Sequence, residues 1–165
     1  MTTSKFIPPA DWIVRPSPNY NKRSHPVDSI ILHADAASRI DSSLGWVRRK
    51  ESKVSYHIMI GRKGEVYLVV NPDDRAWHAG VSTFNGKNNV NNFSIGVCLS
   101  NKNDGLEKHT EVQLIAAAKV CALLCKHYGI LLSNITTHAV IAPGRKTDPV
   151  ALDLETFKKL VQAED

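Results

Sequence analysis

The chain has 165 residues, 42% of them hydrophobic, with a net charge of +5 and an isoelectric point near 9.2. This length suits a single domain with a sizeable core, and this composition excludes a disordered chain. No apolar run approaches the ~20 residues that span a bilayer, so we expect no membrane insertion. The basic balance suits an anionic polymer, but we expect no nucleic-acid partner, because there is no arginine-rich run and no aromatic RNA-binding pattern.

The first 27 residues carry five of the eight prolines and predict an extended arm. Apolar side chains such as Phe6 and Trp12 are expected to pack this arm over the rest of the chain. We therefore expect a proline-rich arm, residues 1–27, followed by one domain, residues 28–165. The N-terminus has no uninterrupted apolar stretch, so it does not predict a secretory signal, which favours a cytoplasmic protein.

Several runs rich in β-branched and aromatic residues predict strands. Residues 61–64, Gly-Arg-Lys-Gly, separate two of these runs and predict a hairpin. Residues 71–92 are rich in Asn, Asp and Gly and are expected to form a loop. The predicted strands are residues 28–32, 56–60, 65–70, 94–99 and 135–137.

Helix signals lie between these strands. Thr110 and Gln113 have the spacing of a capping box, and Gly129 is expected to end the helix that they begin. This succession of strands and helices predicts a mixed α/β fold, with helices covering a mixed sheet. The other two predicted helices are residues 44–49, after a cap at Asp41–Ser43, and residues 154–162, after a cap at Asp153.

Residues 137–149 place an imidazole, a lysine and a carboxylate on one proline-bounded loop, at His138, Lys146 and Asp148. The prolines make a continuous helix improbable, and a loop can bring His138 and Asp148 to one point. A further histidine, His33, ends a predicted strand. Two histidines and one carboxylate are the ligand number of a catalytic zinc site. On spacing alone, hydrogen-bonded structural histidines remain the commoner alternative.

The chain resembles the zinc-dependent N-acetylmuramoyl-L-alanine amidases of the amidase type 2 class, which share a fold with phage lysozyme-type amidases and peptidoglycan recognition proteins. The resemblance covers roughly residues 28 to 160 and implies a central twisted mixed sheet flanked by helices. Its motifs, in the order of the family, are Ile31-Leu32-His33, residues 55–60 (SYHIMI), residues 75–80 (RAWHAG), residues 92–97 (NFSIGV) and residues 138–149.

The resemblance implies that a zinc ion is bound by His33, His138 and Asp148. It also implies that Lys146 stabilises the oxyanion of the transition state. Tyr56 matches a catalytic tyrosine of the phage lysozyme-type enzymes. Cys98 stands where the recycling-type relatives carry a glutamate that is thought to act as general base, so the resemblance leaves the proton-transferring group open.

Four further residues are expected to contact substrate. Trp77 and His78 occupy a motif that lines the groove of the relatives, and Asn92 begins the next motif. Arg145 has a planar guanidinium suited to a carboxylate of the peptide stem.

The resemblance implies an amidase that cuts the bond between N-acetylmuramic acid and L-alanine in bacterial peptidoglycan. The leading interpretation is a monomeric, bacteriolytic phage endolysin that accumulates in the cytoplasm and reaches the wall after the membrane is breached. The alternatives are a cytoplasmic amidase that recycles anhydromuropeptides, which Asp148 favours and Cys98 opposes, and a non-catalytic peptidoglycan-binding module.

Overall fold

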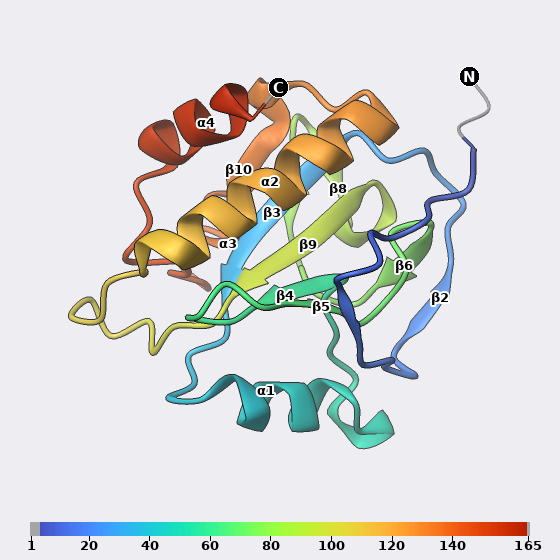
Figure 1. Cartoon of the computed structure of the whole chain (residues 1–165). Helices are drawn as coiled ribbons and strands as arrows, with labels where there is room; N and C mark the ends of the chain where they lie inside the picture. The colour runs from blue at the N-terminus through green and yellow to red at the C-terminus, as the bar shows by residue number, and fades with distance from the viewer. Residues whose placement is uncertain (1–3, 165) are drawn as a thin grey trace.

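A six-stranded mixed sheet forms the centre of the computed structural model, which describes residues 4–164 (Figure 1). Its strand order is β1-β5-β4-β9-β3-β10, and two small two-stranded sheets, β2-β6 and β7-β8, lie beside it. The strands are β1 (Ile13–Val14), β2 (Tyr20–Lys22), β3 (Ser29–Ala34), β4 (Ile58–Ile60), β5 (Val66–Leu68), β6 (Asp74–Ala76), β7 (Thr83–Phe84), β8 (Lys87–Asn88), β9 (Ser94–Leu99) and β10 (Ile135–Thr137).

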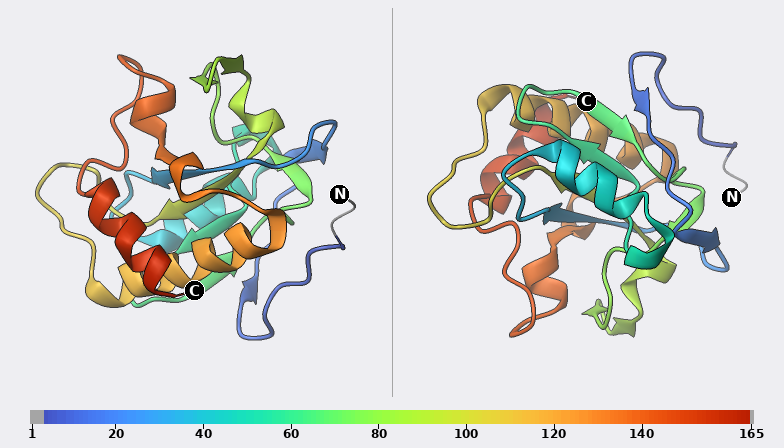
Figure 2. Two further views of the ribbon diagram at one scale, coloured as in Figure 1. Left: turned by 90° about the horizontal axis from the view of Figure 1, so that it is seen from above. Right: turned by 90° about the horizontal axis from the view of Figure 1, so that it is seen from below.

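Helices cover both faces of the central sheet, as Figures 1 and 2 show: α2 and α4 lie on one face and α1 lies on the other. This arrangement confirms the predicted mixed α/β fold. The α-helices are α1 (Ile40–Val47), α2 (Glu111–Tyr128), α3 (His138–Ile141) and α4 (Leu154–Ala163), and the 3-10 helices are η1 (Lys50–Ser52), η2 (Val90–Asn92) and η3 (Leu132–Asn134).

The central strands β3 and β9 are buried along their whole length, as expected for parallel strands covered on both faces. Successive side chains alternate between the two faces. Ile30 and Leu32 pack in the main hydrophobic core with residues of α2 and α4, whereas Ile31 packs with residues of η2 and α3. By the same alternation, His33 points to the face of Ile31 and away from the main core.

The N-terminal arm packs against the domain, as its apolar residues predicted. β1 pairs with β5, and β2 pairs with β6. The Phe6 side chain is buried in the main core. Arg23 reaches inward and donates hydrogen bonds to the carbonyl oxygens of Pro72 and Ser94, at 2.9 and 2.7 Å. Residues 1–3 and 165, at the ends of the two predicted segments, lie outside the described residues.

The α2 helix begins and ends where the sequence predicts. The Thr110 side chain accepts a hydrogen bond from the Gln113 backbone N–H, and Gly129 adopts a left-handed conformation with φ of 70°. The second half of the predicted capping box is wrong. The Gln113 side chain donates instead to the carbonyl oxygens of Ile60 and Ser100, at 3.0 and 2.9 Å, because these lie within reach of the buried amide.

Two other local predictions need correction. Helix α1 begins at Ile40, so Asp41 lies in its first turn instead of capping it. Residues 71–92 are not a plain loop, since they contain β6, β7, β8 and η2. Among residues 4–164, no helix has both the length and the apolar character needed to cross a membrane.

Candidate metal centre and substrate cleft

Two adjacent parallel strands deliver the two histidines of the candidate centre. β3 and β10 pair in parallel, with Leu32 opposite Thr137, so His33 and His138 follow side by side near the carboxyl ends of the strands. This edge of a parallel sheet is where α/β proteins commonly bind ligands. Both histidine side chains are buried.

Asp148 returns to the same point through the predicted loop. Helix α3 stops at Ile141, and Gly144 turns the chain with φ of 78°, a left-handed conformation that favours glycine. The Asp148 carbonyl oxygen accepts a hydrogen bond from the Ala139 N–H at 3.0 Å, and the Asp148 carboxylate accepts one from the Ala34 N–H at 3.2 Å. These two bonds hold Asp148 against β3 and the first turn of α3.

The ligand atoms of His33, His138 and Asp148 converge. The two Nδ1 atoms are 3.0 Å apart, and they lie 3.4 and 3.2 Å from the nearest carboxylate oxygens of Asp148. In a tetrahedral zinc site with bonds of about 2.0–2.1 Å, neighbouring ligand atoms are about 3.3 Å apart. The atoms that face one another are imidazole nitrogens and carboxylate oxygens, and their lone pairs repel unless a proton or a cation lies between them. Two imidazoles and one carboxylate therefore fit a zinc ion with an open fourth position.

Burial shapes the charges at this centre. Burial lowers the pKa of His33 to about 4, although its hydrogen bond with Asp148 acts in the opposite direction. Burial also acts to raise the pKa of Asp148, but hydrogen bonds and charge interactions with His138 and His33 outweigh it and leave this pKa well below its usual range. A neutral His33 and an ionised Asp148 are the protonation states that bind a metal ion.

The two predicted catalytic residues, Tyr56 and Lys146, lie in the same cleft as the candidate centre. The Tyr56 ring is tilted against the His33 ring, with centroids 5.0 Å apart, and the Tyr56 hydroxyl is hydrogen-bonded to the Cys98 sulfur. Burial raises the pKa values of both Tyr56 and Cys98 well above their ordinary values. Both groups are therefore protonated at neutral pH, and the Cys98 thiol does not supply the base that a glutamate would.

The cleft has a volume of about 530 Å³, in the range of small-molecule sites. Trp77, His78 and Arg145, three of the residues expected to contact substrate, line it. An Arg145 Nη2 atom donates to the carbonyl oxygens of Ala79 and Val81, at 2.7 and 2.8 Å, so part of this guanidinium holds the wall of the cleft.

Asn92 does not lie in the cleft lining; its Oδ1 accepts a hydrogen bond from Arg75 Nε at 2.7 Å. The neighbouring Asn91 lines the cleft instead. Neither Asn91 nor Asp35, another lining residue, was expected in the cleft from the sequence. Asp35 lies two residues after His33, and this spacing was a signal that it continues on the same face of the chain.

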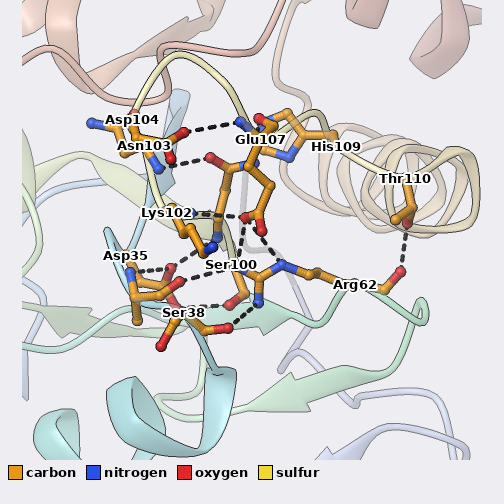
Figure 3. Close-up of polar contacts among 12 residues, drawn as sticks. Asp35, Ser38, Arg62, Ser100, Lys102, Asn103, Asp104, Glu107, His109 and Thr110 are labelled. Atoms are coloured by element: carbon orange, nitrogen blue, oxygen red, sulfur yellow. Dashed lines mark hydrogen bonds and ion pairs between the residues drawn. The ribbon is translucent and has the colours of Figure 1, made fainter.

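A second polar cluster holds the loop that follows β9, as Figure 3 shows. Arg62 donates to Glu107 Oε1 from Nε and Nη2, at 3.1 and 2.6 Å, and to the carbonyl oxygens of Ala37 and Ser38, at 3.0 and 3.1 Å. The same Glu107 oxygen accepts from the Lys102 N–H at 2.9 Å. This cluster joins the loop after β9 to the loop after β3, and each loop contributes a residue to the cleft.

Comparison with known proteins gives consistent results. The family model described as N-acetylmuramoyl-L-alanine amidase matches residues 23–151. The 1,6-anhydro-N-acetylmuramyl-L-alanine amidase AmpD of Salmonella typhimurium is 44% identical over 110 residues, which cover 66% of this chain and 58% of the relative. The chain thus spans little more than half the length of that relative.

Two solved structures have the same fold over most of this chain. A crystal structure of an AmpD derivative matches with a TM-score of 0.78 and 29% identity, covering 98% of this chain and 99% of that one. The amidase AmiD from E. coli, in complex with the substrate anhydro-N-acetylmuramic acid-L-Ala-D-γ-Glu-L-Lys, matches with a TM-score of 0.74 and 25% identity, covering 85% and 60%. Since the family match runs from residue 23 to residue 151 and contains all three converging ligands, the chain belongs to the N-acetylmuramoyl-L-alanine amidase family.

Proposed function

We propose that this protein is a zinc-dependent amidase that hydrolyses the bond between N-acetylmuramic acid and L-alanine in soluble 1,6-anhydromuramyl peptides. The observation that carries the proposal is the convergence of His33, His138 and Asp148 at the wall of the cleft. Tyr56 and Lys146 line the same cleft, and the Salmonella relative is named for this bond. The interpretation as a phage endolysin has less support, because that relative and the bound AmiD substrate both have the anhydro form.

The chain supplies groups for each part of an amide hydrolysis. The overall reaction adds one water, with a hydroxyl forming a bond to the carbonyl carbon and a proton passing to the nitrogen as the C–N bond breaks. Zinc, when bound by the two histidines and Asp148, supplies Lewis-acid activation of water and of the carbonyl. Lys146 and Tyr56 line the cleft, and we propose that the Lys146 ammonium stabilises the developing oxyanion and that the Tyr56 hydroxyl orients the attacking water.

The shape of the site favours a small substrate. A cleft of about 530 Å³ can enclose a sugar and the first residues of a peptide. Arg145 and Trp77 at its edge are proposed to contact the peptide stem and the sugar. His78 is less suited to substrate contact, because both of its ring nitrogens are engaged within the protein. An amidase for soluble fragments would act in the cytoplasm, where such fragments are recycled.

Wall degradation is the second candidate, and one observation favours it. Tyr56 lies against His33, and Cys98 replaces the glutamate of the recycling enzymes, which together give the pattern of the phage lysozyme-type amidases. A non-catalytic binding module has less support, because a module that only binds has no need of three converging ligand atoms.

The test compares two substrates with one protein. The zinc-loaded chain is incubated with soluble anhydromuramyl tripeptide and, separately, with intact peptidoglycan sacculi, and the products are identified by mass spectrometry. We expect rapid release of the tripeptide from the soluble substrate and slow release from sacculi. His138→Ala is the control that removes a zinc ligand and should be inactive on both. Faster cleavage of sacculi would support the wall-degrading enzyme, and no cleavage of either would contradict the amidase itself.

A further inference from the structure

The buried ring of His78 lies directly behind the candidate metal centre. His78 Nδ1 is 2.9 Å from His33 Nε2, and His78 Nε2 is 3.1 Å from the hydroxyl oxygen of Ser94 on β9. The two imidazoles meet edge to face, with ring centroids 5.0 Å apart. The His78 side chain therefore links a metal ligand to the centre of the sheet through hydrogen bonds at both ends.

The Ser94 end of this link determines which nitrogen of each imidazole carries the proton. The Ser94 hydroxyl lies 2.6 Å from the carbonyl oxygen of Val90 and must donate its one proton there, since a carbonyl only accepts. Toward His78 the Ser94 oxygen can then only accept, so His78 Nε2 carries a proton. In a neutral imidazole, His78 Nδ1 is then a bare acceptor.

We infer that His78 is a positioning residue of the metal centre, which fixes the tautomer and orientation of His33 so that its Nδ1 lone pair faces the metal. A bare His78 Nδ1 requires that His33 Nε2 carry a proton and donate it. His33 Nδ1 is then unprotonated, and it is the atom that faces His138 and Asp148. The inference rests on the zinc site of the proposed function, and it assigns to this chain the second hydrogen bond that ligating histidines commonly make.

The backbone next to His78 fixes the tautomer and orientation of His138. The Ala79 carbonyl oxygen lies 3.1 Å from His138 Nε2, so this nitrogen donates and Nδ1 again faces the metal. Asn91 Oδ1 holds the segment by accepting from the N–H groups of His78 and Ala79, at 3.0 and 2.8 Å. Residues 78 and 79 thus orient both ligating rings from one short segment.

Gly96 on β9 leaves the space that the His78 ring occupies. A Cβ atom at this position would lie 2.5 Å from His78 Cγ, a distance that real contacts do not reach. The glycine is therefore needed for the close approach of the ring to the sheet, and not for an unusual backbone conformation. Displacing the ring by a methyl group at residue 96 should have the same consequence as removing it.

The test measures zinc affinity in the absence of substrate. Zinc dissociation constants are determined by competition with a chromophoric chelator for the wild type, His78→Leu and His78→Asn. Leu keeps bulk but offers no acceptor, and we expect it to weaken zinc binding ~10–100-fold, the usual cost of losing such a partner. Asn places Oδ1 near the position of Nδ1, so it should recover most of that loss. In zinc-free protein, nitrogen chemical shifts of His33 should show the Nε2–H tautomer in the wild type and a mixture in His78→Leu.

His57→Leu is the matched control. His57 is also buried beside His78, with ring centroids 5.7 Å apart, but it hydrogen-bonds Asp74 and Gly96 instead of a ligand. We expect it to lower stability and leave zinc affinity unchanged. Unchanged zinc affinity in His78→Leu, or an equal loss in His57→Leu or His78→Asn, would overturn the inference.

A second variant covers the case in which His78→Leu does not fold, and a separate activity assay tests the proposed function. If His78→Leu does not fold, Ser94→Ala keeps the ring and removes only the acceptor that fixes its tautomer, and a loss of zinc affinity there supports the inference while no loss overturns it. Because no substrate is present, failure of the protein to cleave anhydromuramyl peptides would contradict the proposed function and leave the zinc measurement intact.

Discussion

The candidate metal centre lines the cleft, and the Arg62–Glu107 cluster joins two loops that contribute residues to it, but the two clusters differ in what completes them. In the Arg62–Glu107 cluster, guanidinium and backbone N–H donors face carboxylate and carbonyl acceptors (Figure 3). In the cluster of His33, His138 and Asp148, the atoms that face one another are two imidazole nitrogens and a carboxylate. The first cluster is satisfied by the fold itself, whereas the second needs a proton or a cation at its centre.

The difference indicates which cluster serves structure and which serves chemistry. A buried polar group without a partner costs free energy, so a fold keeps such an arrangement where a ligand completes it. The Arg62–Glu107 pair is about one quarter exposed at each side chain and sits at the base of a loop. We therefore expect substitutions in the metal centre to change zinc binding and catalysis, and those in the Arg62–Glu107 cluster to change stability alone.

The largest effect is expected from substitutions of Asp148 in the metal centre. Asp148→Asn should lose zinc and activity, because Asn carries no charge and is a poor zinc ligand, whereas Asp148→Cys should retain zinc and some activity. Asn still offers an oxygen to the Ala34 N–H, so the domain should remain folded. Metal content and circular dichroism of both variants check this. A zinc-replete, active Asp148→Asn protein would remove Asp148 from the centre.

The next effect concerns groups that act on chemistry without binding the metal. Lys146→Ala should lower kcat by ~10²–10³, the usual cost of one oxyanion-stabilising donor, with zinc content unchanged. Tyr56→Phe removes only a hydroxyl and should also lower turnover. Steady-state rates are compared with those of Lys159→Ala, an exposed lysine on α4 that serves as the control. Normal turnover in both variants would show that neither residue has its assigned role.

In the zinc-free protein, mild acid should lower folding stability through the buried histidines before it affects the Arg62–Glu107 cluster. Burial lowers the pKa of His33 to about 4 and that of His57 well below 6.5, so between pH 6.5 and pH 4 the unfolded chain binds protons that the folded chain does not. Stability should therefore be full above pH 6.5 and fall as the pH decreases, by on the order of 3 kcal/mol for His33 alone. Desolvation acts to raise the pKa of Glu107, but hydrogen bonds from Arg62 and Lys102 outweigh it and lower this pKa, so the Arg62–Glu107 cluster should contribute only below about pH 5, where the carboxyl of the unfolded chain begins to bind protons.

Urea unfolding at a series of pH values measures this effect. Zinc should offset the loss in part, since it binds only the unprotonated ligands of the folded state. A stability that is constant from pH 7 to pH 4 would contradict the neutral state of the buried histidines.

The smallest expected effect comes from a substitution in the Arg62–Glu107 cluster. Arg62→Met should lower the free energy of unfolding by about 1–2 kcal/mol, because a partly buried ion pair and two hydrogen bonds to carbonyl oxygens are lost. Arg39→Met is the matched control, since Arg39 and Asp41 form a highly exposed pair that should contribute nothing measurable. Zinc affinity should be unchanged in both, and a loss in Arg62→Met would show that the two clusters are coupled.

Local sequence patterns determined most of the framework. Ser94–Leu99 was predicted as a strand to the residue, and Thr110 and Gly129 set the ends of α2, because strand propensity and helix caps act within a few residues. The sequence also indicated that no continuous helix runs through residues 137–149, since proline and glycine restrict the backbone, but it missed the short helix α3 (His138–Ile141) at the start of this segment. The ligand set itself came from the resemblance to the amidases, and its spacing left structural histidines as an alternative.

Only the tertiary structure decided how the site is oriented. His33 meets His78 and His138 across 45 and 105 residues of chain, and the ring nitrogens that face the metal depend on those contacts. The same holds for the choice of Asn91 over Asn92 in the cleft, and for the Gln113 side chain, which bonds the carbonyl oxygens of Ile60 on β4 and Ser100 just after β9 instead of completing the helix cap. The physical reason is that a side chain takes the hydrogen-bond partners that packing brings within about 3 Å, and packing joins residues that are remote in sequence.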